Sequence, residues 1–383
     1  MISVDEALAR CLALVTPLPS EVIPLRHASG RMMAAPVTAR LTQPPFDASA
    51  MDGYALGSLS GKYTMIGEAA AGHAFNGQLA PDQAIRIFTG APVPAGAVTV
   101  AMQEDVTRDG DQITLAAPVL GANIRPKGQD FTIGDTLPPR PLRPADLALL
   151  AAMNNPDIAV HRRPVVAIIA TGDELVSPGA DPRPDQIIAS NSFALAAMVE
   201  GVGGIARMLP IARDDKDALK YVFSLAAGAD LIVTIGGTSV GDHDLVGAVA
   251  ADLGLERAFW QIAMRPGKPL MAGRVMSAAM LGLPGNPVSA IVCAHLFMIP
   301  MLRAMQGLPP LPPPLIARLG ADVAPTGPRA HYMRAHLSDG VITPFTRQDS
   351  ALLSVLTSAN ALLVRPVDDL ARMAGDQVSY LPV

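Results

Sequence analysis

Apolar residues recur at helical intervals over residues 7–12, near the start of the chain. Ser3 and Glu6 precede them with the spacing of a capping box, so we predict a helix that begins there and ends before Pro17. A second helix is predicted to start near residue 28 and to stop before residue 36. The chain therefore opens with short helical pieces.

Residues 44–135 follow a different pattern, in which short runs of β-forming residues are separated by glycine, proline and aspartate. This texture predicts a small all-β module, followed after a proline-dense passage by a helix over residues 145–153. The predicted strands of the module include residues 63–67, 84–88, 98–102 and 112–115.

Continuous apolar runs mark the middle of the chain, at residues 164–170, 230–235 and 278–283. Such runs are typical of strands buried on both faces. They alternate with helices predicted over residues 193–199 and 288–305. The alternation predicts an α/β domain with a parallel sheet that helices cover on both sides.

A proline-rich stretch at residues 307–314 follows this domain and predicts a stiff linker. The remaining residues, from about 315 to 383, are again rich in β-forming runs. We therefore expect two β modules flanking an α/β domain, with helical pieces at the N-terminus.

Composition narrows the class of protein. The 383 residues are 50% hydrophobic but only 4% aromatic, so the cores must be aliphatic. At about 150 residues per domain the length suggests roughly two or three domains. The net charge of −5 argues against a general nucleic-acid binder. No run of about 18 uncharged apolar residues occurs, so we expect no transmembrane helix and no membrane partner.

The number and spacing of the cysteines indicate the cellular compartment in which the protein folds. Cys11 and Cys293 are too few and too far apart for a disulfide framework or a zinc site, and we expect both to be buried helix residues. The first residues are acidic and lack the positive start of a signal peptide. We therefore expect a cytoplasmic protein.

Loops that follow strands are where open α/β sheets bind their ligands. Residues 171–175 hold Asp173 and Glu174, whose carboxylates could bind Mg²⁺ or move a proton, although this segment alone is more often a solvated turn. Asp214 and Asp215 lie at another strand-to-helix turn. They predict a cap for the helix over residues 216–225 and could share the same cleft.

The glycine-rich loop of residues 236–244 is a stronger candidate. Its glycines and hydroxyl side chains allow backbone N–H groups to approach an anion closely. Asp242 and Asp244 would repel a bare phosphate, but they suit a Mg²⁺ ion placed between them and phosphate oxygens. The alternative is a glycine-rich helix entry with an aspartate cap, which needs one acid and no glycine run, so we favour an anion site. The residues concerned are Gly236, Gly237, Thr238, Ser239 and Gly241.

A third candidate combines residues 264–269 with residues 283–287. Arg265 and Lys268 supply positive charge for an acidic ligand. Prolines around glycine fix the path of both segments, and the second opens the long helix. The alternative is two proline-shaped turns without a ligand. The second turn consists of Pro284, Gly285, Asn286 and Pro287.

The β module carries three further polar segments, at residues 49–55, 88–94 and 123–130. Each segment by itself more often forms an ordinary turn than a binding or catalytic site. Their candidate side chains are Asp52, Thr89, Arg125 and Asp130.

Taken together, these segments resemble the molybdopterin molybdenumtransferase family, the bacterial MoeA type shared with the E domain of gephyrin. One such motif would be a weak signal, but the ordered set is highly specific and covers most of residues 45–305. The motifs are SAMDGYAL (49–56), FTGAPVP (88–94), NIRPKGQD (123–130), ATGDEL (170–175), ASNSFAL (189–195), RDD (213–215), GGTSVGDHD (236–244), RPGKP (265–269) and LPGNPVSA (283–290).

The resemblance implies a multidomain α/β plus β protein. Its parts are a discontinuous helical domain (residues 1–44 plus 131–161), a β-rich module (45–130), a central α/β molybdopterin-binding domain with a parallel-type sheet (162–307) and a C-terminal β-barrel (308–383). It also implies an elongated homodimer, whose active site joins the α/β domain of one subunit to the β module of the other.

The resemblance further implies a reaction in which molybdate is inserted into adenylylated molybdopterin and AMP is released, with Mg²⁺ or a similar cation. Position by position, the essential acids of the family match Asp52, Glu174, Asp214 and Asp244, which would be catalytic and would hold the metal through substrate phosphate. The β-module positions match Thr89, Arg125 and Asp130, and the molybdopterin and phosphate contacts match Lys268 and residues 284–287.

Two segments depart from the family pattern. The family commonly has lysine where Arg265 stands, and a forked guanidinium is not a point-charge ammonium. Residues 347–354 only loosely follow the family's Gly-Ser-rich turn.

Two rival functions stand beside this one. A molybdopterin adenylyltransferase shares the α/β domain, but it would be a single domain without the SAMDGYAL motif and the C-terminal barrel. A non-catalytic molybdopterin-binding scaffold would not need the four acids.

Overall fold

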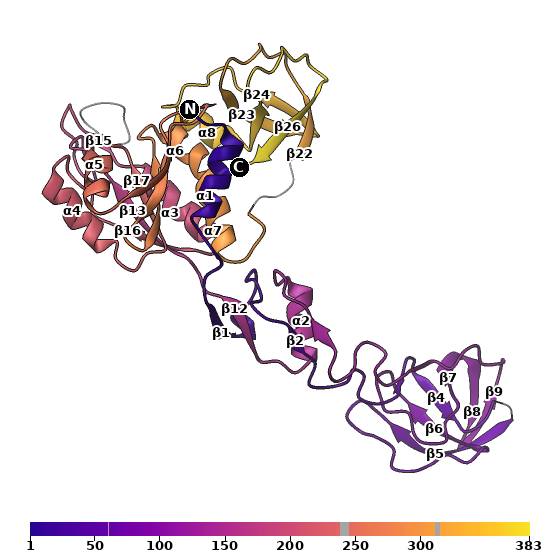
Figure 1. Ribbon diagram of the computed structural model, residues 1–383. Helices are drawn as coiled ribbons and strands as arrows, with labels where there is room; N and C mark the ends of the chain where they lie inside the picture. Colours follow the sequence, from indigo (N-terminus) through magenta and orange to yellow (C-terminus); the bar gives the residue numbers. More distant parts are fainter. Residues whose placement is uncertain (60, 238–244, 311–314) are drawn as a thin grey trace. The chain divides into compact units, whose positions relative to one another are not determined.

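The computed structural model describes residues 1–59, 61–237, 245–310 and 315–383. The chain divides into two compact units, which are described separately (Figure 1). The first unit contains Met1–Glu21 and His161–Val383, and the second contains Val22–Val160.

A six-stranded sheet forms the centre of the first unit, in the order β16-β13-β17-β21-β20-β18. The first four strands are parallel to one another. β20 pairs antiparallel with β21, and β18 pairs antiparallel with β20, so β20 is the one strand of this sheet that runs against the others. The three predicted apolar strands are confirmed, and the sheet is mixed because a tight turn joins β20 directly to β21 as a hairpin. The strands are β13 Val165–Ala170, β16 Ile205–Met208, β17 Leu231–Ile235, β18 Glu256–Trp260, β20 Met271–Val275 and β21 Ala278–Leu283.

Helices cover both faces of this sheet, as predicted. Successive residues of β13 point to opposite faces, so Val166 and Ile168 enter one core while Ala167 and Ile169 enter the other. The first core is shared with α1, α3, α6 and α7, and the second with α4 and α5. The helices are α3 Asn191–Gly201, α4 Lys216–Leu225, α5 Leu245–Asp252, α6 Pro287–Cys293 and α7 Ile299–Met305, with the π-helical turn Ala294–Met298 between the last two.

The N-terminal helix α1 (Val4–Ala13) confirms the predicted cap, because the Glu6 backbone N–H donates to Ser3 Oγ at 3.1 Å. Its apolar residues Ala7 and Cys11 are fully buried in the first core of this unit. Residues 1–21 belong to the same compact unit as the α/β sheet, because the apolar face of α1 packs there. The division into four domains, with residues 1–44 and 131–161 in one discontinuous helical domain, stays a prediction.

The long apolar helix is a core element. The run Pro287–Met305 has 19 residues and is apolar enough to cross a membrane, but 72% of its most apolar window is buried inside the protein. Such burial is typical of a central helix in a large globular core. Cys293 on this helix is fully buried, like Cys11 on α1, which confirms the positions expected for both.

A closed β-barrel follows the α/β sheet. Its strands run in the order β23-β24-β22-β26-β25, and β25 pairs again with β23 to close the ring. The short strand β19 extends the sheet from β23, and part of the predicted proline linker lies outside the described residues. The elements are β19 Met264–Arg265, β22 Leu315–Leu319, β23 Ala330–Ser338, β24 Val341–Pro344, α8 Leu353–Ser358, β25 Ala361–Arg365 and β26 Gln377–Pro382.

The second unit contains the predicted β module as a six-stranded sheet in the order β7-β4-β6-β5-β9-β8. The four predicted strands match β5, β6, β7 and β9, and the predicted helix matches α2 (Pro144–Ala152). The sheet strands are β4 Gly53–Leu56, β5 Lys62–Ala69, β6 Gln83–Ile87, β7 Thr99–Met102, β8 Val106–Asp109 and β9 Gln112–Leu115.

Short strand pairs complete the described elements. The pairs are β1 Ser20–Pro24 with β12 Asp157–His161, β2 Val37–Thr38 with β11 Thr136–Leu137, β3 Ala48–Ser49 with β10 Ile124–Arg125 and, in the first unit, β14 Leu175–Val176 with β15 Ile187–Ile188. The short 3₁₀ turns are Leu25–His27 and Gln103–Asp105.

The predicted helix over residues 28–35 is wrong. Gly30 adopts a φ of +72°, a left-handed conformation that interrupts a helix. Met32 and Met33 then form isolated bridges with Pro141 and Val160. Their backbone groups therefore bond across to the second half of the unit instead of forming local helical bonds.

Candidate functional site

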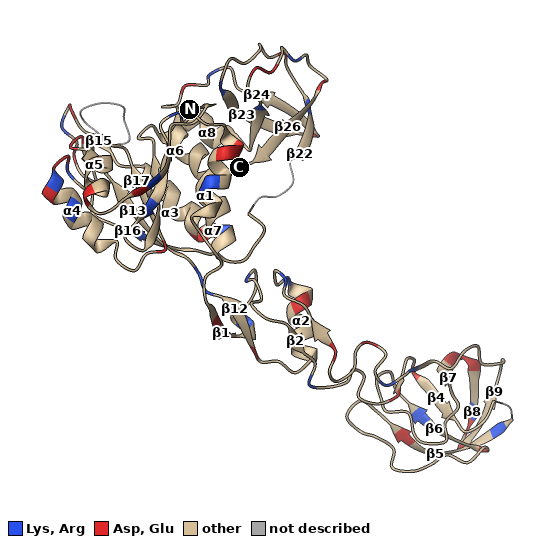
Figure 2. Cartoon of the chain, in the orientation of Figure 1, with Lys and Arg blue, Asp and Glu red and all other residues tan. Residues whose placement is uncertain are grey.

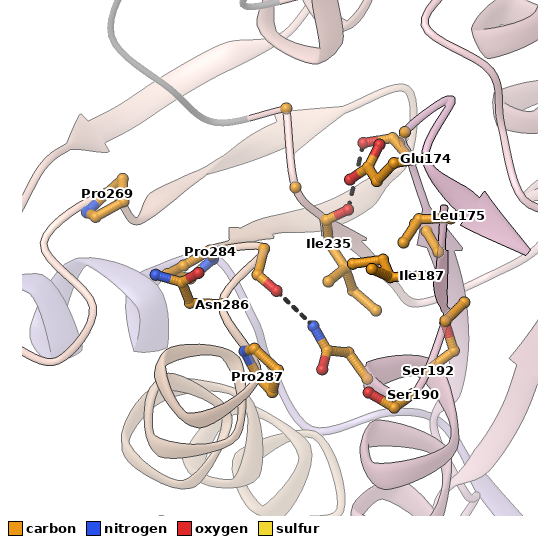
Figure 3. A pocket seen from close by; sticks show the side chains of 18 of the residues that line it. Glu174, Leu175, Ile187, Ser190, Ser192, Ile235, Pro269, Pro284, Asn286 and Pro287 are labelled. Carbon is orange, nitrogen blue, oxygen red and sulfur yellow. Dashed lines mark hydrogen bonds between the residues drawn. The ribbon is translucent and has the colours of Figure 1, made fainter. Parts of the chain in front are cut away.

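The ends of the parallel strands form a pocket in the first unit. β13, β17 and β21 end at Ala170, Ile235 and Leu283 and, being parallel, end at the same edge of the sheet. The loops beyond them surround a pocket of about 870 Å³ (Figure 3). The predicted site residues that line it are Glu174, Asp214, Gly236, Gly237, Lys268, Pro284, Gly285, Asn286 and Pro287.

The first loop brings Glu174 to the pocket. Gly172 has a φ of +144° and donates its N–H to Ala212 O at 3.1 Å, which bends the chain directly after the strand. The Glu174 carboxylate lies directly over this glycine, so a side chain at position 172 would have to displace it and would also need a φ that L-residues rarely adopt. Glycine at this position therefore allows the acid to lie at the strand end.

The two adjacent aspartates have separate tasks. Asp215 caps α4, because its Oδ1 accepts from the N–H groups of Asp217 at 3.0 Å and Ala218 at 2.9 Å. The predicted cap is thus confirmed, while Asp214 lines the pocket. The Asp214 N–H donates to Asp173 Oδ1 at 3.3 Å, so Asp173 supports this turn.

The glycine-rich loop begins against the wall of the pocket. Gly236 and Gly237 have φ angles of +87° and +63°, and a side chain on Gly237 would collide with Val246. Both positions therefore require glycine. The predicted residues Thr238, Ser239, Gly241, Asp242 and Asp244 lie outside the described residues.

The third candidate supplies a cation and a proline turn. Gly267 packs directly onto the Cys293 thiol, with a φ of +107°, and the next residue, Lys268, lines the pocket. No ion pair of Lys268 occurs among the residues that the structure describes, which leaves its charge available to an anionic ligand. Pro287 occupies the first turn of α6, as predicted.

Arg265 lies outside the pocket lining, unlike Lys268. It belongs to β19 and pairs with His331 of the barrel strand β23. Its predicted contact with the substrate therefore stays a prediction that the pocket does not support. The guanidinium instead joins a group of cations around His331.

This cationic group could not be predicted from the sequence. Arg334 is fully buried, and its Nε and Nη1 have no hydrogen-bond partner among the described residues. Its Nη2 donates to Asp349 O at 3.0 Å, and the next residue, Ser350, accepts from Asn286 Nδ2 at 3.1 Å. Arg334 therefore holds a barrel segment that touches the pocket turn. The only sequence signal was an arginine inside a β-rich run.

Burial, together with the neighbouring cations, lowers the pKa of His331. Burial lowers the pKa of its imidazole from 6.5 to about 4, with further contributions from Arg265, Arg334, Arg365 and Arg329. Because the folded pKa lies below the unfolded one, the unfolded chain takes up the proton first as the pH falls. The contribution of the neutral His331 to the free energy of unfolding is therefore complete above pH 6.5 and is lost as the pH falls from 6.5 to about 4.

We expect His331→Gln to flatten this part of the pH dependence. The free energy of unfolding, measured in denaturant at several pH values between about 7 and 4, should fall less steeply for the variant than for the parent. His336→Gln, which changes an exposed histidine on the same strand, is the matched control and should leave the slope unchanged. Equal slopes for His331→Gln and the parent would contradict this account.

The β module holds a second acidic site. Asp52 Oδ1 accepts hydrogen bonds from the Thr89 N–H at 2.7 Å and from Thr89 Oγ1 at 2.8 Å. These two bonds, with the positive charge of Arg86, lower the pKa of the Asp52 carboxyl. The carboxylate is therefore charged at neutral pH and exposed to solvent.

Arg86 supports the backbone on which Asp52 lies. Its guanidinium stacks at 5.0 Å from the ring centroids of both Tyr54 and Phe88, and its Nη1 donates to Gly53 O at 3.3 Å. No local sequence pattern identifies Arg86, because only the tertiary structure places it beside the turn.

The three predicted motifs of the β module converge on strand β3. Ser49 exchanges backbone hydrogen bonds with residues 90 and 91, and Ala50 N–H donates to Asn123 O at 2.8 Å. Arg125 lies on β10, opposite Ala48, and Asp130 N–H donates to Gln43 O at 3.1 Å. Both side chains are exposed. The structure thus joins Asp52 to Thr89 and brings the Arg125 strand beside the same turn.

Figure 2 marks the positions of the acidic and basic residues in both units, which are few because only 16% of the residues are charged. Among the described residues, no group of three His, Cys, Asp or Glu side chains is arranged to hold a metal ion. Glu174 and Asp214 line the same pocket and are the described carboxylates that could hold a magnesium ion there, since Mg²⁺ is commonly held by one or two carboxylates together with substrate phosphate.

Family models match three consecutive parts of the chain. A model described as the MoeA N-terminal region, domains I and II, matches residues 2–154. One described as a probable molybdopterin binding domain matches residues 167–304, and the MoeA C-terminal region, domain IV, matches residues 316–383.

Relatives of known name cover nearly the whole chain. A molybdopterin molybdenumtransferase of Nostoc sp. is 35% identical over 94% of this chain and 88% of its own length. Molybdopterin molybdenumtransferase 2 of Mycobacterium tuberculosis is 37% identical over 93% of both chains. The crystal structure of a molybdopterin biosynthesis MoeA protein from Pyrococcus horikoshii OT3 is 27% identical, has a TM-score of 0.86 and covers 100% of both chains.

Proposed function

Because the chain belongs to the molybdopterin molybdenumtransferase family, we propose that it is a transferase of molybdenum cofactor biosynthesis, which inserts molybdate into adenylylated molybdopterin and releases AMP. The observation that carries this proposal is the pocket at the strand ends, where two carboxylates, one lysine and a glycine-rich wall face one cavity. A molecule with several phosphate charges suits such a lining.

The pocket's own groups can bind and orient this substrate. The Lys268 ammonium would hold a phosphate oxygen, and the backbone at Gly236 and Gly237 allows oxyanions to come close. Opening a phosphoanhydride depends more on charge stabilisation than on a nucleophilic side chain, because the leaving oxygen keeps the bonding electron pair and its charge must be stabilised. Glu174 and Asp214 would hold Mg²⁺, which neutralises phosphate charge when it is bound.

The remaining acids complete the proposed site. Asp244 belongs to the glycine-rich loop, and Asp52 with Thr89 lies in the other compact unit of the chain. We propose that the enzyme is a homodimer in which the β module of one subunit, including Arg125 and Asp130, meets the pocket of its partner. In support, only Glu174 and Asp214 of the four proposed acids line the pocket among the residues that the structure describes.

The rival functions are less well supported. The N-terminal and C-terminal family models match the parts of the chain that a single-domain adenylyltransferase would lack. A scaffold has no need for a charged Asp52 held by two hydrogen bonds, or for acids beside a lysine in a pocket.

The product of the reaction tests this proposal. The purified protein, incubated with adenylylated molybdopterin, Mg²⁺ and molybdate, should yield a cofactor that activates a molybdenum enzyme prepared without it. Omission of molybdate is the control and should give no activation. Failure to activate that enzyme with molybdate present, by protein that binds the substrate, would refute the transferase and favour the scaffold.

A further inference from the structure

The proline turn of residues 284–287 is held from two sides. Asn191, the first residue of α3, donates from its Nδ2 to Gly285 O at 2.7 Å (Figure 3). On the other side, Asn286 Nδ2 donates to Ser350 Oγ at 3.1 Å, and Val288 N–H donates to Ser350 O at 3.1 Å. The turn is therefore fixed by contacts from α3 and from the barrel segment, in addition to its own prolines.

The Asn191 amide keeps this bond at a cost in stability. Its Oδ1 is buried and has no hydrogen-bond partner among the described residues, which is unfavourable for a polar atom. Rotation of the amide would not relieve this cost, because it would point the Oδ1 lone pairs at the Gly285 carbonyl oxygen. The unpaired Oδ1 does not stabilise the fold, so stability alone does not explain an asparagine at this position. Such a local conflict is expected where a group is kept for function.

The bond controls a wall of the pocket. Gly285 lies against the next loop, since a Cβ atom built on it would be 3.7 Å from Gly236 Cα. Gly236 N–H in turn donates to Leu283 O at 3.0 Å, and Gly236, Gly285 and Asn191 all line the cavity. A shift of the turn would therefore change the spacing between the two loops that are proposed to surround the substrate phosphates.

We propose that Asn191 is a positioning residue, which sets the place of the Gly285 carbonyl and, through it, the width of the pocket between the proline turn and Gly236. This inference rests on the proposed function, because the ligand whose binding reports the pocket width is adenylylated molybdopterin. It concerns a side chain from a sequence motif, residues 189–195, to which the proposed reaction gives no other role.

Binding and stability together test the inference. Affinity for adenylylated molybdopterin is measured by titration calorimetry with Mg²⁺ and without molybdate, so that no turnover is expected. Asn191→Ala should raise the dissociation constant about tenfold, which corresponds to a loss of about 1.4 kcal/mol of binding free energy. Its melting temperature should equal or exceed that of the parent, because the orphaned acceptor is gone. Asn191→Asp keeps the shape and suits the start of a helix but lacks the donor, so it should bind as weakly.

The kinetic pattern separates positioning from other roles. In the full reaction, the Asn191 variants should lose about tenfold in kcat/KM, chiefly through KM. Glu200→Ala, on an exposed position of the same helix, is the control and should bind as the parent does. If both Asn191 variants bind with the affinity of the parent, this inference is overturned but the proposed function is not. The same holds if their weaker binding comes with a lower melting temperature. Failure of the parent to bind the substrate would overturn the proposed function as well.

Discussion

Replacement of Glu174 by glutamine is expected to reduce molybdate-dependent AMP release about 10²-fold or more, the range seen when one preorganised electrostatic group is removed from an active site. The side chain lies at the end of β13 and lines the pocket that also contains Asp214 and Lys268. Glutamine has nearly the same shape, so the close packing over Gly172 is kept while the negative charge is lost. The rate of AMP formation at saturating substrate measures the effect.

The dependence on Mg²⁺ adds a second readout for this variant. If Glu174 helps to hold the ion, Glu174→Gln should need a higher Mg²⁺ concentration for half-maximal rate. Glu200→Gln, the same substitution at an exposed position of α3, is the matched control. An unchanged rate and an unchanged Mg²⁺ requirement in Glu174→Gln would remove this residue from the proposed catalytic site.

Replacement of Asp52 by asparagine is expected to reduce AMP release by a similar or larger factor. The amide oxygen of the new side chain could still accept both hydrogen bonds from Thr89, so the local fold should be kept and only the charge removed. Asp111→Asn, in an exposed turn of the same module, should leave the rate unchanged. The measurement is AMP release with the melting temperature as a check on folding.

Mixing of inactive subunits extends this test to the proposed shared site. In a heterodimer of Asp52→Ala and Glu174→Gln subunits, one site would contain both changes and the other would contain neither. About half of the parental rate per dimer should then return. No recovery in verified heterodimers would show that Asp52 and Glu174 act within one chain or not at all.

The sequence was most informative where buried strands are followed directly by loops that carry candidate site residues. The continuous apolar runs at 164–170, 230–235 and 278–283 identified the central strands, because a strand buried on both faces needs no alternation. Once these strands are parallel, their loops must meet at one edge, which is why Glu174 and Asp214 could be expected to share a cleft before the fold was known. Lys268, which precedes β20, was placed there by its charge and by the family motif. The separate role of Asp215 as a cap likewise followed from local sequence.

The remaining features depend on contacts between distant segments. Ser350 reaches Asn286 from 64 positions away, and the buried guanidinium of Arg334 holds the same barrel segment. No local pattern encodes such pairs. The predicted helix over residues 28–35 failed for a similar reason, because Met32 and Met33 form isolated β-bridges opposite Pro141 and Val160, with the Met33 N–H donating to Arg140 O at 3.1 Å. Arg265 matched a motif by position, yet its strand pairing places it beside the barrel cations.

The most direct test of the central claim is the stoichiometry of the reaction in a purified system. The protein is mixed with adenylylated molybdopterin, Mg²⁺ and molybdate, and both released AMP and molybdopterin-bound molybdenum are counted. The account predicts one AMP for each molybdenum inserted and almost no AMP when molybdate is left out. Tight binding of the substrate without AMP formation, or AMP release at the same rate without molybdate, would contradict it.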